Sequence, residues 1–396
     1  MQLRHADLAV GERTLFSYRI VSRLYFHLSV LFVLFAVSGL DTLAIEAVLA
    51  VYGLCIVLAG PISRRLLLHT GPITTLVVGE SAKALGLVLI AISPGTLTLA
   101  FAGQVLNGLG FGLTSTADPV VVNATFAGNP QRIGRFQATA QSLMFLTVLV
   151  AGVIGAFMFR WQTSAPLWFA AGATGLAVLL ASRLPRAQAP AKVGAPTTSL
   201  RSLGHQQVRA AAYYVLTRGF MLAAFVGLLP FLLYERLALG VIPLSFALAA
   251  FSLAAFVTAR YSQALLALAG PTVIVVGSVV LLALAFVVFA FTHDVVVAVA
   301  AMTITGAASG LVRPVTMRRL SQISQDHPQL PGLGQVAGLM ERAFGIANAA
   351  VIVLGGVLIT SFSFRTGMLL LAAILVVSEA AVLALARGDG SATPAG

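Results

Sequence analysis

The sequence predicts an all-α membrane protein in which twelve transmembrane helices form two six-helix bundles related by a pseudo-repeat. Three observations support this fold class. Hydrophobic residues make up 59% of the 396 residues and charged residues only 9%, with a mean hydropathy of +0.99, whereas soluble domains carry roughly 25% charged residues. Long apolar runs recur along the chain, and one glycine-proline segment occurs twice, about half a chain length apart.

Each predicted span is an apolar run of about 20 residues, the length that an α-helix needs to cross a bilayer. Backbone groups in lipid must be hydrogen-bonded within their own segment, and the runs lack the alternation of a membrane β-barrel, so we expect helices. Twelve runs meet this condition, at residues 21–40, 44–62, 72–92, 96–117, 135–158, 165–183, 210–233, 241–260, 271–291, 295–314, 335–359 and 365–386.

A repeated segment indicates that the chain consists of two related halves. Gly71-Pro72, within LLLHTGPITTLVVG, recurs as Gly270-Pro271, within LLALAGPTVIVVG. A fixed period in a sequence is typical of a repeated structural unit. In a chain this hydrophobic, it favours two parallel membrane halves around a central substrate path.

The longest polar stretch, residues 184–208, is rich in Pro, Ala, Ser and basic residues and is predicted to be a linker. It lies between the sixth and seventh predicted spans. We therefore expect a first bundle at residues 1–183 and a second at residues 209–396, joined by a cytoplasmic linker.

Basic residues predict the orientation of the chain. With the N-terminus inside, eighteen of the 24 Lys and Arg residues fall on one side of the membrane, three on the other and three within spans. Since cytoplasmic segments are enriched in Lys and Arg, both termini are expected in the cytoplasm. The N-terminal residues show no signal-peptide pattern. We expect a multi-pass protein of the cell membrane, of the bacterial inner-membrane type.

Several classes of function are not supported by the sequence. The net charge of +12 comes from residues at the ends of apolar runs, so nucleic acid is not an expected partner. The single cysteine, Cys55, and six scattered His residues form no metal-binding pattern. No clustered catalytic set or nucleotide-binding loop is visible. We expect a monomer in the lipid bilayer that is not an enzyme and carries no cofactor.

Ionisable residues inside the spans are the main functional candidates, because each costs roughly 2.5–3.5 kcal/mol to insert. Glu80 and Lys83 share a helix face at i,i+3 spacing, and they form either a structural ion pair or a pair coupled to protons or substrate. Asp118 and Arg313 each precede a proline at comparable places in the two halves. They either meet as a cytoplasmic gate or are separate helix-end residues.

Other charged residues allow two interpretations. Arg218 has no acidic neighbour in the sequence; it either extends to the cytoplasm or lines a cavity and binds an anionic group. Glu341 and Arg342 are either a helix-end pair or functional. Asp41 and Glu46, beside the first outer loop, are expected to be solvated.

The organisation resembles the major facilitator superfamily over about residues 20–387. The segment from Gly71 to Gly79 resembles the end of that family's loop between spans two and three, and GLGFGLTSTADPVVV resembles the fourth span of drug- and siderophore-exporter-like members. The loop also departs from the family pattern of Gly, Asp-Arg, Gly. Arg64, Leu68 and His69 occupy the first three of these positions, so the acid that helps latch the two halves is missing.

The resemblance implies two bundles that rock around a central site, with spans one, four, seven and ten lining the path. The implied cavity residues are His27, Gln104, Asn107, Tyr214, Arg218 and Thr305. The proton-coupling candidates are Asp118, Glu80 and Glu341, and the gate or charge-pair candidates are Lys83, Arg313 and Arg342. His27 is either a proton relay or a hydrogen-bonded structural residue.

The function implied by the resemblance is secondary active transport, coupled to protons, with export of a small amphipathic or anionic drug, metabolite or siderophore by antiport. Two alternatives remain open at this point. One is import of a similar solute. The other is a non-transporting membrane receptor or scaffold on the same fold, which the altered loop at Arg64, Leu68 and His69 favours.

Overall fold

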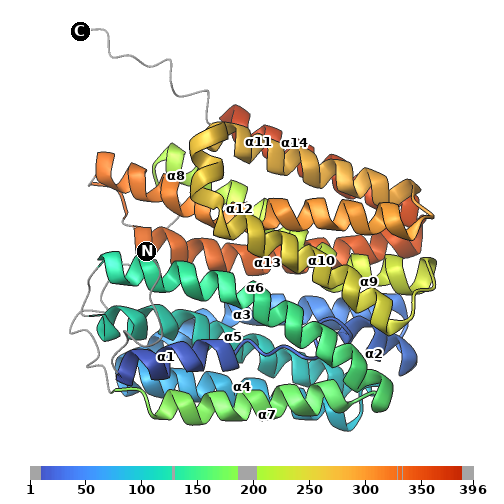
Figure 1. The fold of residues 1–396 in the computed structure, drawn as a ribbon, viewed down its shortest axis with the longest axis horizontal. Coiled ribbons are helices and arrows are strands. Elements are labelled where there is room, and N and C mark those ends of the chain that lie inside the picture. The colour runs from blue at the N-terminus through green and yellow to red at the C-terminus, as the bar shows by residue number, and fades with distance from the viewer. Residues whose placement is uncertain (1–9, 127–129, 186–202, 328, 332, 386–396) are drawn as a thin grey trace.

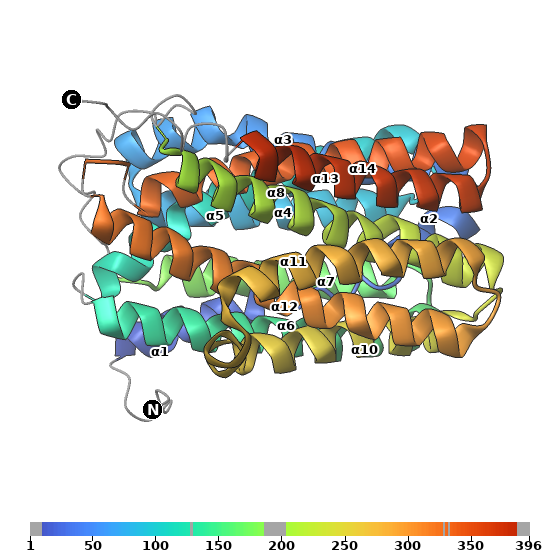
Figure 2. The same cartoon turned by 90° about the horizontal axis from the view of Figure 1, so that it is seen from above.

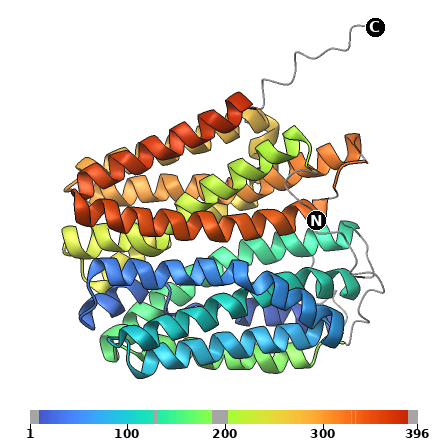
Figure 3. The same ribbon diagram turned by 180° about the vertical axis from the view of Figure 1, so that it is seen from behind.

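The computed structural model of the protein describes residues 10–126, 130–185, 203–327, 329–331 and 333–385. Within these ranges the chain is helical apart from short connections and contains no strand, which confirms the predicted all-α class (Figure 1). The first half, coloured blue to green, and the second half, coloured yellow to red, form two layers of helices in Figure 1 and, from behind, in Figure 3.

The helices of the first half are α1 (Val10–Val21), α2 (Leu31–Val37), α3 (Thr42–Thr70), α4 (Pro72–Ile92), α5 (Leu97–Thr125), α6 (Pro130–Trp161) and α7 (Ala165–Ser182). Those of the second half are α8 (His205–Ala223), the π-helix η3 (Ala224–Leu228), α9 (Leu229–Phe231), the π-helix η4 (Leu232–Arg236), α10 (Val241–Arg260), α11 (Ser262–Phe291), α12 (Val295–Asp326), α13 (Leu333–Ser361) and α14 (Phe364–Leu385).

Ten helical stretches within the described ranges are long and apolar enough to cross a membrane. One of them, Thr42–Ile92, contains two predicted spans, because α3 and α4 meet at Gly71. The first predicted span, residues 21–40, begins at the end of α1 and contains α2 after a stretch of turns, and both helices are too short to be counted alone. With these two adjustments the helices correspond to the twelve predicted spans, and the protein is a multi-pass membrane protein.

The first span is not the continuous helix that residues 21–40 predict. Residues 22–30 form turns between α1 and α2, and this stretch is called the unwound segment below. Its backbone lies very close to α6: a Cβ atom at Gly155 would overlap the carbonyl oxygen of Phe26. The Ser29 hydroxyl donates to the carbonyl of Gly152 at 2.8 Å. The unwound segment is therefore held by tertiary contacts with α6, which hydropathy cannot reveal.

The repeated Gly-Pro pair adopts the same backbone bend in both halves. Gly71 has φ 85° and ψ 172°, and Gly270 has φ 74° and ψ 159°. Residues with a Cβ avoid this region of positive φ. The following proline lacks a donor that the first turn of a helix does not need, so Pro72 and Pro271 begin spans three and nine. The sequence repeat thus corresponds to a structural repeat.

The two halves pack together along two pairs of helices, α3 against α13 and α6 against α10. Figure 2 shows that these contacts lie on opposite sides of the molecule. We call the end at which α7 ends and α8 begins the linker end, and the opposite end the far end. At the far end α2 also contacts η3 and α9, and the rings of Phe32 and Phe231 meet edge to face at 6.1 Å. The halves therefore close against each other at the far end.

Candidate functional site

A cavity of about 260 Å³ lies between the two halves. Its lining comes from the unwound segment and from α2, α3, α4, α5, α6 and α7 in the first half, and from α8, η3, α10, α12 and α13 in the second. Irregular backbone at membrane depth is tolerated where it lines a cavity or is buried in protein. The position of the unwound segment on this cavity therefore accounts for a break within a membrane span.

The unwound segment brings Arg23 to the cavity. The Arg23 Nη1 donates to the Tyr25 hydroxyl at 2.9 Å, and the guanidinium lies 5.3 Å from the centre of the Phe111 ring. Arg23 forms no ion pair with any described residue. His27 of the same segment also lines the cavity, and its buried Nδ1 has no hydrogen-bond partner in the part of the chain that the structure describes.

A second cationic group on the cavity is built around Glu341. Arg218 Nη1 lies 3.0 Å from both carboxylate oxygens of Glu341, and the Tyr214 hydroxyl donates to Oε1 at 2.6 Å. Arg313 Nη1 lies 3.7 Å from the same oxygen. The Arg218 guanidinium is also 4.4 Å from the centre of the Phe344 ring. Glu341 and the rings of Tyr214 and Phe344 therefore fix Arg218. The Nε and Nη2 of Arg218 donate to no other described residue.

The ion pair between Glu80 and Lys83 forms as their spacing predicts. Lys83 Nζ lies 2.6 Å from Glu80 Oε2, and the Tyr18 hydroxyl donates to Glu80 Oε1 at 2.9 Å. Lys83 lines the cavity, whereas Glu80 is only 1% exposed and lies behind it. Tyr18 joins α1 to this pair, a contact over 62 residues of sequence.

The predicted gate between Asp118 and Arg313 does not form in this structure. Asp118 instead pairs with Arg19 of its own half, whose Nε donates to Oδ1 at 2.9 Å. Arg313 turns toward Glu341 in its own half. Glu341 pairs with Arg218 and Arg313 and not with Arg342, so the interpretation of Glu341 and Arg342 as a helix-end pair does not hold in this structure. Adjacent residues on a helix point in different directions, which explains why Arg342 does not pair with Glu341.

Four of the six predicted cavity residues line the cavity, namely His27, Gln104, Asn107 and Arg218. Tyr214 does not, because it is fully buried and its hydroxyl is bonded to Glu341. Thr305 is also fully buried, and its hydroxyl donates to the Ala301 carbonyl of its own helix at 2.9 Å. Arg342 is exposed on α13 and does not line the cavity.

Sequence reasoning missed some cavity residues. Arg23 lies at the start of the first predicted span and counts in the sequence only among the basic residues that predict orientation, because hydropathy does not reveal the break in that span. Asn348, a buried polar residue of α13, also lines the cavity. A signal for it was present, since an asparagine in an apolar run is costly unless it faces a partner or a polar space.

The two acids beside the first outer loop differ in their surroundings. Asp41 is exposed as expected and caps α3, accepting from the Ala44 amide at 2.8 Å. Glu46 is only 1% exposed, and no described residue forms a hydrogen bond with either carboxylate oxygen. The expectation that Glu46 is solvated is therefore wrong, because the second half covers this face of α3.

The cavity carries positive charge. The charged residues in its lining are Arg23, Lys83, Arg218 and Arg313, and no Asp or Glu belongs to the lining. Glu80 and Glu341 lie behind and offset part of this charge. A cleft lined by one sign of charge within low-dielectric walls raises the local concentration of the opposite charge.

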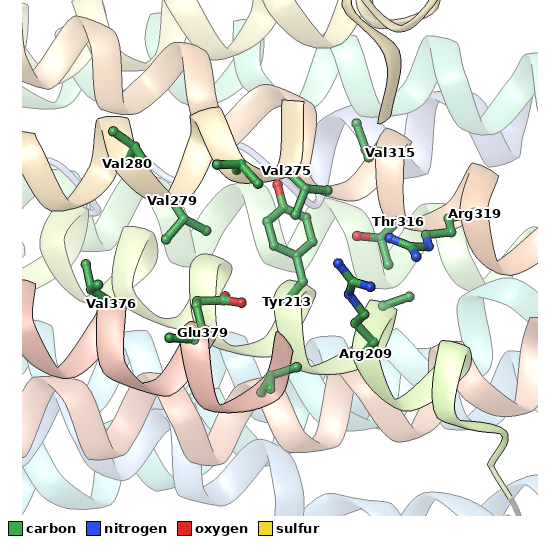
Figure 4. A pocket seen from close by; sticks show the side chains of 14 residues that line it. Arg209, Tyr213, Val275, Val279, Val280, Val315, Thr316, Arg319, Val376 and Glu379 are labelled. Carbon is green, nitrogen blue, oxygen red and sulfur yellow. The ribbon is translucent and has the colours of Figure 1, made fainter. Parts of the chain in front are cut away.

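A second cavity, of about 160 Å³, lies within the second half (Figure 4). Half of its lining residues are valines of α11, α12 and α14. Figure 4 shows Arg209 and Arg319 on one side of Tyr213 and Glu379 on the other. The Glu379 carboxylate accepts from the Thr217 hydroxyl at 3.1 Å. All the residues that line this second cavity belong to the second half, so the cavity is not part of a path between the halves.

Among the described residues, no group of three or more His, Cys, Asp or Glu side chains lies close enough to hold a metal ion. The central cavity therefore offers cationic, amide and aromatic side chains for binding. Such a site can bind and orient an anionic group by charge-assisted hydrogen bonds.

Comparison with known proteins places this geometry in a family. No curated protein sequence matches the chain. Among solved structures the chain is similar to the nucleoside transporter NupG, with a TM-score of 0.70 and 16% identity over 94% of this chain and 98% of that chain. It is also similar to the peptide transporter POT in complex with sulfate, with a TM-score of 0.77 and 14% identity over 98% and 96% of the two chains.

A POT family transporter in complex with 5-aminolevulinic acid is a further similar structure, with a TM-score of 0.74 and 13% identity over 94% of this chain and 95% of that chain. At these identities the likeness shows the fold. Residues 16–329 match the family model of the Major Facilitator Superfamily. Because this match covers most of the sequence, the chain belongs to the Major Facilitator Superfamily.

Proposed function

We propose that this secondary transporter moves a small anionic organic solute through the central cavity. The observation that supports the proposal is the charge of the lining, which contains four cationic side chains and no acidic one. Arg23 forms no ion pair with a described residue, so an anion in the cavity would give this arginine a direct ion-pair partner. A buried charge without a counter-charge is costly in a membrane protein.

The rest of the lining favours an organic solute with an apolar part. The cationic groups lie among Phe111, Phe344 and aliphatic side chains such as Leu87. Ligand sites of this kind bury the apolar body of the ligand and orient it with a few polar groups. Arginine donates in a planar fork that fits a carboxylate or phosphate, so the solute would carry one of these groups.

Export by antiport against protons, with a drug, metabolite or siderophore as the solute, remains the prediction from the sequence. Import of a similar solute is the alternative within the same family. Direction is decided by comparing flux in right-side-out and inside-out vesicles under an imposed pH gradient. A receptor or scaffold would show binding without flux in either preparation.

The substrate class is tested with matched solute pairs in proteoliposomes. Benzoate is compared with benzamide, and phenyl phosphate with phenol, by currents on a solid-supported membrane and by competition for binding. The anionic member of each pair is expected to bind and to give the larger response. A preference for the neutral members, or for cationic solutes, would contradict the proposal.

The residues are tested by removing one cationic group at a time. Arg23→Gln and Arg218→Gln are each expected to weaken anion binding by about 10- to 100-fold, because a hydrogen bond to a charged group contributes about 1.5–3 kcal/mol. Arg160→Gln, an exposed arginine at the far end of α6, is the control and should bind as the unaltered protein does. Equal weakening in all three variants would argue against a specific role for the cavity arginines.

A further inference from the structure

Glu46 lies near the start of α3, at the far end of the molecule, in an unusual environment. Its side chain is 1% exposed, and both carboxylate oxygens are buried without a hydrogen-bond partner among the described residues. Buried polar atoms are nearly always hydrogen-bonded, so a carboxyl group with two unsatisfied oxygens requires an explanation.

The recess around Glu46 is formed by the opposite half of the molecule. A Cβ atom at Gly227 of η3 would lie 2.6 Å from Glu46 Oε2 and 2.9 Å from Oε1. A Cβ atom at Gly356 of α13 would lie 3.0 Å from both Cβ and Cγ of Glu46. Any larger residue at these two positions would push against the side chain. The carboxyl group is therefore enclosed only while the two halves are in contact at the far end.

Gly227 lies in a π-helical stretch of span seven. Such stretches are rare and occur often at functional sites. η3 contacts both α2 and α3 of the first half. The Glu46 recess and the aromatic contact between Phe32 and Phe231 thus belong to the same closed seam between the halves.

Glu46 forms no ion pair with any described residue. The elements packed against α3 are α2, α4, α5, α13 and η3. Their charged residues are Glu80 and Lys83 on α4, Asp118 on α5, and Glu341 and Arg342 on α13, while α2 and η3 carry none. Glu341 precedes Gly356 by fifteen residues, roughly 22 Å along a helix. Asp41 is exposed at the N-cap of α3, and Tyr52 of α3 lines the central cavity. The other ionisable residues of α3 follow Glu46 by nine positions or more, namely Cys55, Arg64, Arg65 and His69.

An ionised carboxylate in this recess would have neither a donor nor a cation, and its burial would cost several kcal/mol. A protonated carboxyl group would cost much less. The candidates from the sequence, Asp118, Glu80 and Glu341, differ in this respect, since each has an Arg or Lys partner within its own half.

We propose that Glu46 is the proton-binding site that couples proton movement to transport. A proton that adds to a carboxylate oxygen of Glu46 removes its charge and permits the far end to close. Loss of that proton restores the charge, which requires water and therefore separates the halves there. This inference rests on the proposed function for its link to solute flux, but the closure of the far end can be measured without any solute.

The first experiment measures closure by the distance between spin labels at the far end. The labels are placed at Thr163 in the first half and His293 in the second, which are both exposed. Thr163→Cys, His293→Cys and Cys55→Ala are combined in one protein, which is labelled in lipid nanodiscs. In otherwise unaltered protein the short distance is expected at low pH, and a longer distance is expected to replace it as the pH rises. Glu46→Gln, a neutral residue of the same shape, is expected to keep the short distance at every pH.

Two further variants complete this experiment. Asp41→Asn removes an exposed carboxylate at the start of the same helix and is expected to keep the full pH dependence. Gly227→Ala is expected to lengthen the distance even at low pH, because its methyl group would occupy the carboxyl recess. The proposal is overturned if the unaltered protein shows no pH dependence, or if Glu46→Gln responds to pH as the unaltered protein does.

The second experiment separates coupling from solute movement in proteoliposomes. Glu46→Gln is expected to lose at least 10-fold in accumulation driven by a pH gradient and to retain solute exchange at equal pH. Retained gradient-driven accumulation would rule out Glu46 as the coupling site. If no solute moves in any protein, including the unaltered one, the proposed function fails, and the distance measurement still decides whether Glu46 controls closure.

Discussion

Glu341 shows how one acidic residue can organise several cationic ones. It accepts from Arg218 and Tyr214 and lies near Arg313. The acid holds Arg218 in place while the nitrogens of that arginine that do not contact Glu341 stay available to a solute. This arrangement depends on residues 123 to 127 positions apart, so the sequence presents Arg218 as an isolated charge.

At this scale we predict that Glu341→Gln destabilises the protein by about 1–2 kcal/mol, because Arg218 and Arg313 then lie together without a counter-charge. The loss is smaller than for a fully buried pair, since about 30% of the Glu341 side chain is exposed. Thermal unfolding in detergent measures it. Glu235→Gln, an exposed acid in η4, is the control and should stay within about 0.5 kcal/mol. Arg218→Gln combined with Glu341→Gln should recover part of the loss.

The elements repeat more faithfully in their turns than in their helices. The bends at Gly71 and Gly270 are nearly identical. Spans one and seven differ, since span one unwinds at residues 22–30 and span seven contains the π-helices η3 and η4. Glycine-proline pairs act through local backbone geometry, so they are visible in the sequence. The irregular spans depend on what packs against them, so they are not.

The shared bends lead to a second prediction. Gly71→Ala and Gly270→Ala are each expected to cost about 1–3 kcal/mol of stability, because a residue with a Cβ is strained at these φ values. Gly172→Ala in α7 is the matched control, since a Cβ there meets nothing within 4 Å and alanine favours a helix. Thermal unfolding of the three variants distinguishes strain from a general effect of the substitution. Equal stability of the three variants would contradict the prediction that alanine is strained at Gly71 and Gly270.

For the molecule as a whole, the number of spans and the two-bundle organisation follow from the sequence, and the structure confirms them. Four of six predicted cavity residues also line the cavity, because polar residues in spans one, four and seven tend to face inward. The prediction for Tyr214 and Thr305 fails, because a helix face does not reveal whether a side chain reaches open space or packs against another helix. Glu46 was missed for the same reason.

The orientation of the whole molecule remains a prediction that can be tested directly. Gln206 is exposed at the linker end and Thr163 at the far end. Each is replaced by cysteine in a separate variant that also carries Cys55→Ala. Because positive residues favour the cytoplasm, an impermeant maleimide is expected to label Thr163→Cys in right-side-out vesicles and Gln206→Cys in inside-out vesicles. The reverse pattern would place the linker outside the cell.

The sequence by itself determined that this chain crosses the membrane many times in two related halves, because hydropathy, charge at span ends and glycine-proline bends act locally. Only the tertiary structure decided which charges meet. Arg19 and Asp118 come together across 99 residues, Arg218 and Glu341 across 123, and Glu46 lies against Gly227 and Gly356 of the other half. The energy of a buried charge depends on its partners and on access to water, and both are set by packing between helices that are distant in the sequence.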